Sequence, residues 1–301
     1  MKKNILGVLL MISAAVLFAI STLLMKYIPE ITQLNPGHLA VWRFIVAAPV
    51  MGVFILLKHS PSNFFPKGSL RFIGLGVIYS IASFCAIFAL ERLPASIYVI
   101  VVYIYPALVV FYTLLTGGGV PRTYWFGLPM AILGLVLTAY DFNQVFQVDW
   151  IGLSITIINA IAISAYVFLS GKALKKTNVS LLGTNIILFG GMLVGLFVGA
   201  IFGFRVPGTT VGWLLVFAFG VFGTLFPILL MNYGVQMLGA ARGSVIMPLQ
   251  PVLTVLLSVI FFNDVLTIQQ WLGGFLVLTA IILLQLRSDN GTHKTILNKR
   301  V

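Results

Sequence analysis

Charged residues are scarce in this sequence, and acidic residues are the scarcest of them. Charged side chains make up 8% of the 301 residues, with 18 Lys or Arg and only 6 Asp or Glu, whereas a soluble globular domain has about 25%. With 60% hydrophobic residues, the chain cannot cover a water-facing surface with polar groups, so lipid must surround most of it. The net charge of +12 does not indicate a nucleic-acid partner, because the basic residues stand singly between apolar runs. We expect the lipid bilayer, and no nucleic acid, as a partner.

Cysteine and histidine are almost absent. The single cysteine, Cys85, excludes an intrachain disulfide and a cysteine metal cluster. His38, His59 and His293 lie in predicted loops, at a span edge or in the tail, and no HExxH motif is present. A polytopic membrane enzyme needs a carboxylate pair, a His cluster or an activated nucleophile near the membrane surface. We therefore expect no metal, no cofactor and no enzymatic activity.

Long apolar runs fill the rest of the chain. A bilayer core about 30 Å thick is crossed by roughly 20 apolar residues in a helix, whose backbone groups bond to each other. The first run, Ile5 to Met25, carries no charge and is longer than a signal-peptide core, so we expect it to stay as a membrane helix. The gaps between runs are short and leave no room for a soluble domain. The sequence predicts an all-α membrane protein with ten transmembrane helices, at approximately 5–26, 38–57, 69–89, 95–116, 123–140, 150–171, 181–203, 211–232, 240–262 and 268–286.

The basic residues predict the orientation of these helices. If the N-terminus is cytoplasmic, fourteen Lys and Arg residues fall on the inner side and four on the outer side, while five of the six acidic residues fall outside. Positive charge accumulates on the cytoplasmic side of membrane proteins. We therefore predict a multi-pass protein of the plasma (inner) membrane with both termini in the cytoplasm.

The two halves of the chain repeat the same pattern. Residues 93–106 read LPASIYVIVVYIYP and residues 238–251 read LGAARGSVIMPLQP, so that Leu, Ala and Pro recur 145 positions apart. Gly7 and Gly152 open the first and sixth runs at the same spacing. With five spans per half, equivalent helices cross in opposite directions, as in the inverted repeats of secondary transporters. We predict repeats at 1–145 and 146–286, a cytoplasmic tail at 287–301, and a site between the repeats.

These segments resemble the EamA branch of the drug/metabolite transporter superfamily. The paired L-[PG]-A-[SA]-x(9)-P segments, HLAVWRFIVAAP at 38–49 and FFNDVLTIQQWLGG at 261–274 carry the resemblance, with Asp264 where the family usually has Glu. The resemblance implies a ten-helix exporter of small metabolites that works by alternating access. Small multidrug relatives carry a Glu in their first helix, whereas residues 5–25 here contain no carboxylate. We therefore do not expect proton coupling by that device, and ten helices in one chain favour a monomer.

Ionisable groups inside the bilayer are rare and are functional candidates by default. Arg43 lies about five residues into the second predicted span. Its side chain either extends to the outer interface or binds the carboxylate of a substrate. Lys26 and Lys172 lie at span ends, where a side chain that extends to the interface is favoured over a functional role. Arg242 begins the ninth span on the inner side, where the distribution of positive charge explains it.

Polar residues within the spans suggest a cavity. Tyr98 and Tyr105 are seven apart in the fourth predicted span and share a helix face, whereas Tyr103 points elsewhere. The alternative is that these groups only hold helices together by hydrogen bonds. The predicted substrate-binding residues are Tyr79, Ser83, Tyr98, Tyr105, Asn159, Tyr166, Gln250 and Arg43.

Three prolines are candidates for helix bends or gating. Pro106, Pro248 and Pro251 each remove a backbone donor within or near a predicted span. They either bend helices around a cavity or mark positions that flex during transport.

Tyrosine-rich walls with little fixed charge favour a neutral or zwitterionic solute that has an apolar or aromatic part. We therefore predict a transporter of small organic metabolites, with export of amino acids, aromatic ones first, as the leading hypothesis. The alternatives are export of another metabolite or drug class and, less favoured, a membrane enzyme.

Overall fold

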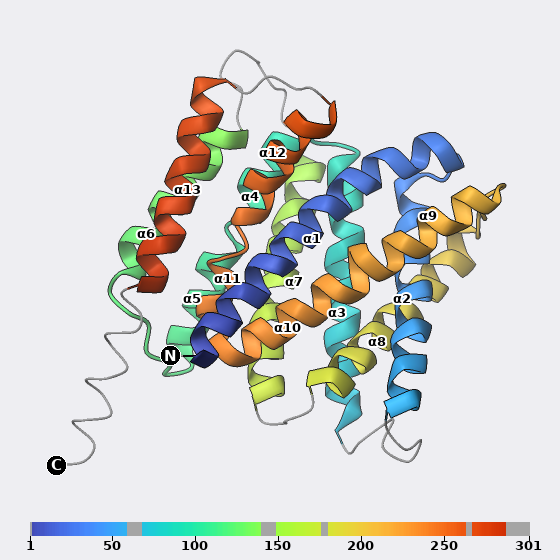
Figure 1. Cartoon of the computed structure of the whole chain (residues 1–301), viewed down its shortest axis with the longest axis horizontal. Helices are drawn as coiled ribbons and strands as arrows, with labels where there is room; N and C mark the ends of the chain where they lie inside the picture. The colour runs from blue at the N-terminus through green and yellow to red at the C-terminus, as the bar shows by residue number, and fades with distance from the viewer. Residues whose placement is uncertain (1, 59–67, 140–148, 176–179, 263–266, 287–301) are drawn as a thin grey trace.

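The computed structural model describes residues 2–58, 68–139, 149–175, 180–262 and 267–286, and these form a helical bundle (Figure 1). Asp264 and the tail from Arg287 lie outside the described residues. The helices are α1 Lys2–Thr32, α2 Pro36–Lys58, α3 Ser69–Leu90, α4 Ala95–Val102, α5 Tyr105–Leu115, α6 Tyr124–Ala139, α7 Trp150–Lys175, α8 Ser180–Phe202, α9 Thr210–Gly220, the π-helix η2 Val221–Leu225, α10 Phe226–Leu238, α11 Ala240–Ser244, α12 Leu249–Phe262 and α13 Ile268–Leu286.

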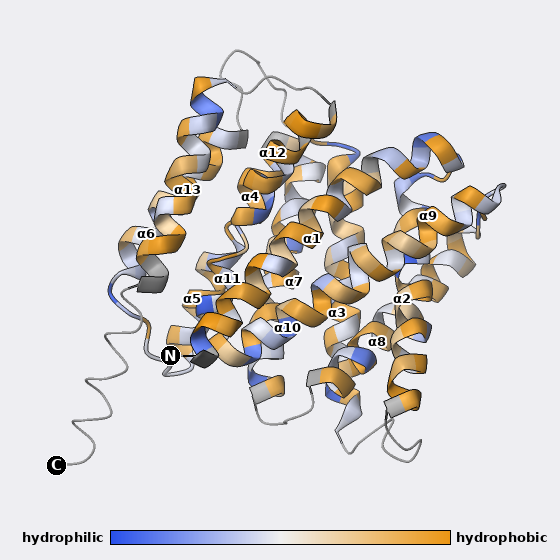
Figure 2. Ribbon diagram, in the orientation of Figure 1, coloured by the Kyte–Doolittle hydropathy of each residue, from blue (hydrophilic) through white to orange (hydrophobic). Residues whose placement is uncertain are grey.

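Hydrophobic residues run along the whole length of these helices (Figure 2). Within the described part of the chain, eight helical spans are long and apolar enough to cross a membrane. Two shorter apolar helices, Tyr124–Thr138 and Ile268–Leu283, occupy the positions of the predicted fifth and tenth spans. The predicted all-α membrane fold is confirmed.

Three of the predicted spans depart from a regular α-helix, two of them by a break. The fourth breaks at Tyr103–Ile104 between α4 and α5, and Pro106 stands in the first turn of α5. The ninth breaks at residues 245–248, between α11 and α12. The eighth contains η2, followed by Pro227 in the first turn of α10. Proline lacks a backbone donor and is tolerated where a helix begins, so each break restarts the helix near a proline.

Contacts between the halves follow the repeat. A Cβ atom placed on Gly7 would lie 2.8 Å from Cγ of Leu238, and one placed on Gly152 would lie 2.8 Å from Cγ of Leu93. Gly7 and Gly152 are 145 positions apart, as are Leu93 and Leu238. Likewise, α1 packs on α10 as α7 packs on α3. The same contact is thus made twice, each time between one half and the other.

Glycines bring helix backbones into direct contact. A Cβ atom on Gly76 of α3 would lie 2.0 Å from the carbonyl oxygen of Ile187 in α8. A Cβ atom on Gly134 of α6 would lie 2.8 Å from the carbonyl oxygen of Gly273 in α13. Small residues allow this approach in lipid, where packing rather than hydrophobicity holds helices together. The α6–α13 pair forms one edge of the bundle (Figure 1).

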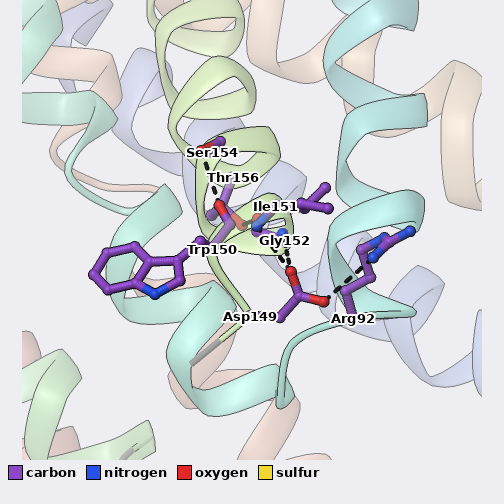
Figure 3. A network of polar contacts seen from close by, with 7 residues as sticks. All are labelled: Arg92, Asp149, Trp150, Ile151, Gly152, Ser154 and Thr156. Atoms are coloured by element: carbon purple, nitrogen blue, oxygen red, sulfur yellow. Dashed lines mark hydrogen bonds and ion pairs between the residues drawn. The ribbon is translucent and has the colours of Figure 1, made fainter. Parts of the chain in front are cut away.

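A polar network joins the halves at the start of α7 (Figure 3). Asp149 Oδ1 accepts hydrogen bonds from the amides of Ile151 and Gly152 at 2.8 and 3.0 Å, and its Oδ2 accepts one from Arg92 Nη1 at 3.2 Å. The Gly152 amide contributes most to lowering the pKa of the Asp149 carboxyl, and the Ile151 amide and Arg92 add to it. Asp149 therefore caps the N-terminus of α7 and ties it to the link before α4.

Candidate functional site

Arg43 of α2 is a buried cation. Its side chain is 9% exposed, and its Nε donates a hydrogen bond to Thr224 Oγ1 at 3.0 Å, while Nη1 donates to Ser83 Oγ at 3.1 Å. The hydroxyl of Tyr79 is close enough to interact electrostatically with the guanidinium. The guanidinium carbon lies 5.7 Å from the ring centre of Phe219. Arg43 is therefore held inside the bundle, and the expectation that it extends to the outer interface is wrong.

No carboxylate of a described residue forms an ion pair with Arg43. The acidic residues that the structure describes are Glu30, Glu91 and Asp149, and they lie at helix ends or in links. A charged side chain at the centre of a membrane helix costs about 2.5–3.5 kcal/mol on insertion scales. The hydroxyl groups accept hydrogen bonds from the guanidinium but carry no negative charge that would neutralise it. The arrangement leaves a buried guanidinium able to bind an anionic group.

The π-helix η2 positions one of the partners of Arg43. The amide of Phe226 donates to the carbonyl of Val221, five residues earlier, which is the bonding pattern of a π-bulge. Such bulges insert one residue into a helix and are frequent at functional sites. Thr224 lies within this bulge, and Ser21 of α1 donates to the carbonyl of Gly223 beside it at 3.1 Å. The π-bulge of the eighth span thus lies at the Arg43 cluster.

Aromatic rings connect Arg43 to a second polar cluster. The ring of Tyr79 lies 4.8 Å from that of Tyr166, centre to centre. Tyr166 donates its hydroxyl to Asn232 Oδ1 at 2.9 Å, and Asn232 Nδ2 donates to Thr184 Oγ1 at 3.0 Å. These side chains come from α3, α7, α10 and α8 and are all buried. Both repeats therefore contribute to one continuous path of polar and aromatic groups.

The remaining predicted residues fall into separate places. Tyr98 accepts a hydrogen bond from Asn159 Nδ2 at 2.8 Å, which joins α4 to α7. Tyr105 is buried, and its ring lies 5.8 Å from that of Tyr103. The prediction that Tyr103 points away from Tyr105 is wrong, because it assumed a continuous helix and the chain breaks at Tyr103–Ile104. Gln250 of α12 lies outside these clusters, and its Nε2 donates a hydrogen bond to Thr22 Oγ1 at 3.5 Å.

The structure thus brings together Arg43, Tyr79, Ser83 and Tyr166, and separately Tyr98 with Asn159. Sequence reasoning missed Thr224, Asn232 and Thr184. Each is a polar residue inside an apolar run, which is the signal that identified the others. Of the prolines, Pro106 and Pro248 lie at breaks, and Pro251 lies in the first turn of α12; a role of these prolines in gating stays a prediction.

Comparison with known proteins agrees with this architecture. The sequence model of the EamA-like transporter family matches residues 5–140 and 150–286, one match in each half. An uncharacterized transporter of Archaeoglobus fulgidus is 23% identical over 214 residues, which cover 70% of this chain and 74% of the relative. One crystal structure of a protein superposes with a TM-score of 0.78 over 94% of this chain and 98% of that one; at 18% identity this shows the fold alone. Two matches that together span nearly the whole chain establish that it belongs to the EamA-like transporter family.

Proposed function

We propose that this transporter exports amino acids, with aromatic amino acids favoured, by alternating access at a site between the two repeats. The observation that carries the proposal is the buried guanidinium of Arg43, whose partners among the described residues are hydroxyl groups. A planar guanidinium matches a carboxylate with two parallel hydrogen bonds. In this proposal the substrate carboxylate supplies the negative charge that none of the described residues supplies to Arg43.

The surroundings of Arg43 suit the rest of such a substrate. Phe44, Phe219, Tyr79 and Tyr166 provide ring faces and edges near the guanidinium, and aromatic pairs are favourable at centre distances of about 4.5–7 Å. The amide oxygen of Asn232 and the hydroxyls of Tyr166 and Thr184 are able to accept from an ammonium group once they exchange their present partners. Because Arg43 is buried in this conformation, substrate access requires the helices around it to move.

A second candidate is another anionic metabolite. A guanidinium binds a phosphate in the same bidentate way as a carboxylate. Aromatic walls around Arg43 favour a planar, apolar group on the solute, so the amino-acid proposal stands first. A plasma-membrane location, cytoplasmic termini and a monomeric carrier are parts of the same proposal and rest on the distribution of Lys and Arg and on the ten helices.

The test is flux of labelled amino acids into proteoliposomes without any ion gradient. The panel contains Phe, Trp, Thr and Met as free amino acids, and protein-free liposomes give the background. Saturable flux of Phe and Trp that unlabelled substrate inhibits is the expected result. Absence of flux for the whole panel contradicts the amino-acid proposal.

A further inference from the structure

A cavity of about 650 Å³ lies away from Arg43, at the end of the bundle where α1 begins. It lies between the two repeats: the link from α5 to α6 forms one wall, and the end of α7 with the link from α10 to α11 forms the other. Leu238, which lines it, is also the contact of Gly7 near the start of α1. Small-molecule sites have volumes of about 300–1,000 Å³, so the cavity is large enough for a metabolite.

The charge of this cavity has one sign. Of the described residues that line it, Lys172 and Arg242 are charged, and none is acidic. The Nζ of Lys172 lies 4.4 Å from the ring centre of Phe168, which also lines the cavity. Membrane topology accounts for basic residues at this end of the bundle. It does not account for two of them, one from each of two helices, facing the same concave space.

An unsatisfied hydroxyl points to a ligand. Tyr124 lines the cavity and is 1% exposed, yet its hydroxyl has no hydrogen-bond partner among the residues that the structure describes. The charge of Arg242 is close enough to act on this hydroxyl. Buried hydroxyls are nearly always bonded, and one without a partner requires an explanation. A hydroxyl near the charge of Arg242, in a cavity that Lys172 also lines, is a suitable donor to an anion.

Glycines form part of the cavity wall. Gly117 and Gly239 line it and have φ angles of +73° and +86°, a region that other residues rarely adopt. A Cβ atom on either glycine, or on Gly119, would meet nothing within 4 Å. At these three positions the wall therefore contributes backbone and no side chain to the space.

We propose that this cavity is a second anion-binding site, at which Lys172, Arg242 and the Tyr124 hydroxyl hold the carboxylate of the transported solute before it reaches Arg43. This proposal rests on the proposed function, because it takes the solute to be an amino acid. If the termini are cytoplasmic, the cavity lies at the cytoplasmic end of the bundle, from which an exporter takes up its substrate. A phosphate group of an anionic lipid has the same chemistry and is the competing occupant.

The test measures binding, not flux, with 4-fluorobenzoate as the probe and 19F NMR as the readout. The full-length protein carries Arg43→Met, so that the Arg43 cluster does not contribute, and is held in phosphatidylcholine nanodiscs. We expect Lys172→Gln or Arg242→Gln, added to Arg43→Met, to weaken binding about tenfold, the loss of one charge-assisted hydrogen bond. Arg71→Gln, an exposed cation on α3 that does not line the cavity, is the matched control and should leave binding unchanged.

Tyr124→Phe separates a ligand role from a structural one. Because the hydroxyl has no described partner, its removal should not lower thermal stability, but it should weaken probe binding about threefold, less than the loss of a charged donor. Lower stability with unchanged binding would overturn the proposal, as would a lack of effect of the Lys172 and Arg242 changes.

Two further outcomes are decisive. If phosphatidylglycerol in the nanodiscs abolishes probe binding, the cavity holds a lipid head group and not the solute. If probe binding disappears with Arg43→Met alone, only the Arg43 site exists. Probe binding at the cavity without flux of any amino acid would support the second site and contradict the amino-acid proposal. Amino-acid flux without probe binding would support the amino-acid proposal and contradict the second site.

Discussion

Replacing Arg43 by Met should separate transport from stability. The change removes a buried charge, which costs about 2.5–3.5 kcal/mol in a membrane helix, and keeps most of the side-chain volume. It also removes the hydrogen bonds from Arg43 to Thr224 and Ser83, and bonds to a charged group contribute about 1.5–3 kcal/mol each. The two effects are similar in size and opposite in sign.

The freed hydroxyls do not add a large penalty. Ser and Thr side chains in helices bond to the carbonyl three or four residues earlier, as Thr22 and Ser80 already do in this protein. We therefore expect the stability of Arg43→Met to stay within about 1–2 kcal/mol of that of the native chain, from the same hydrogen-bond and insertion magnitudes.

Transport should respond much more strongly. If the substrate carboxylate pairs with the guanidinium, its loss removes at least one charge-assisted hydrogen bond, or about 1.5–3 kcal/mol, which corresponds to a reduction in kcat/KM of roughly 10- to 150-fold. The assays are phenylalanine flux in proteoliposomes and thermal unfolding in detergent. Arg43→Lys keeps the charge without the planar fork, and its phenylalanine flux should lie between that of the native chain and that of Arg43→Met. A parallel loss of flux and stability in Arg43→Met would refute the reasoning and assign Arg43 a packing role.

Three other outcomes follow from the structure. Gly76→Ala should lower the midpoint of thermal unfolding, because its Cβ would lie 2.0 Å from the Ile187 carbonyl oxygen and overpacking costs about 1–3 kcal/mol. Gly74→Ala in the same helix is the control, because a Cβ at Gly74 would have nothing within 4 Å. Equal effects of the two changes would contradict the backbone contact. The pKa of Asp149 is lowered in the folded state, so its contribution to stability is present above the unfolded carboxyl pKa and is lost as pH falls through the folded value. The unfolding midpoint of Asp149→Asn should therefore change less with pH in the acidic range than that of the native chain. Identical pH profiles of the two proteins would count against the role of this cap. Because no Asp, Glu or His lies in the middle of a predicted span, an imposed pH gradient should leave flux nearly unchanged, and stimulation of several-fold would show that a proton is coupled by another route.

The helices and the repeat could be predicted because their signals are spread over many residues. An apolar run of about 20 residues is conspicuous in any chain, and the spacing of 145 recurs in several residue pairs. The contacts of Gly7 with Leu238 and of Gly152 with Leu93 show the physical reason for that repetition: the same packing of a glycine against a leucine of the other half is used twice.

The site was predicted only in part, because side-chain partners depend on how helices meet. Tyr79 and Ser83, one turn apart on α3, both face Arg43 as their spacing suggests. Tyr103 was misplaced because a helix break between Tyr98 and Tyr105 changes which face each residue occupies. Thr224 was missed because it reaches Arg43 from a π-bulge, and no periodicity argument anticipates a bulge.

The central claim is that Arg43 recognises the carboxylate of the substrate, and inhibition by substrate analogues tests it most directly. Flux of labelled phenylalanine is measured against 3-phenylpropionate, which keeps the carboxylate, and phenethylamine, which lacks it. The account predicts that 3-phenylpropionate inhibits the native chain at least about tenfold more strongly than phenethylamine does, the value of one charge-assisted hydrogen bond. It also predicts that this preference disappears in the residual flux of Arg43→Met. Equal inhibition by both analogues of the native chain, or an unchanged preference in Arg43→Met, would contradict the claim.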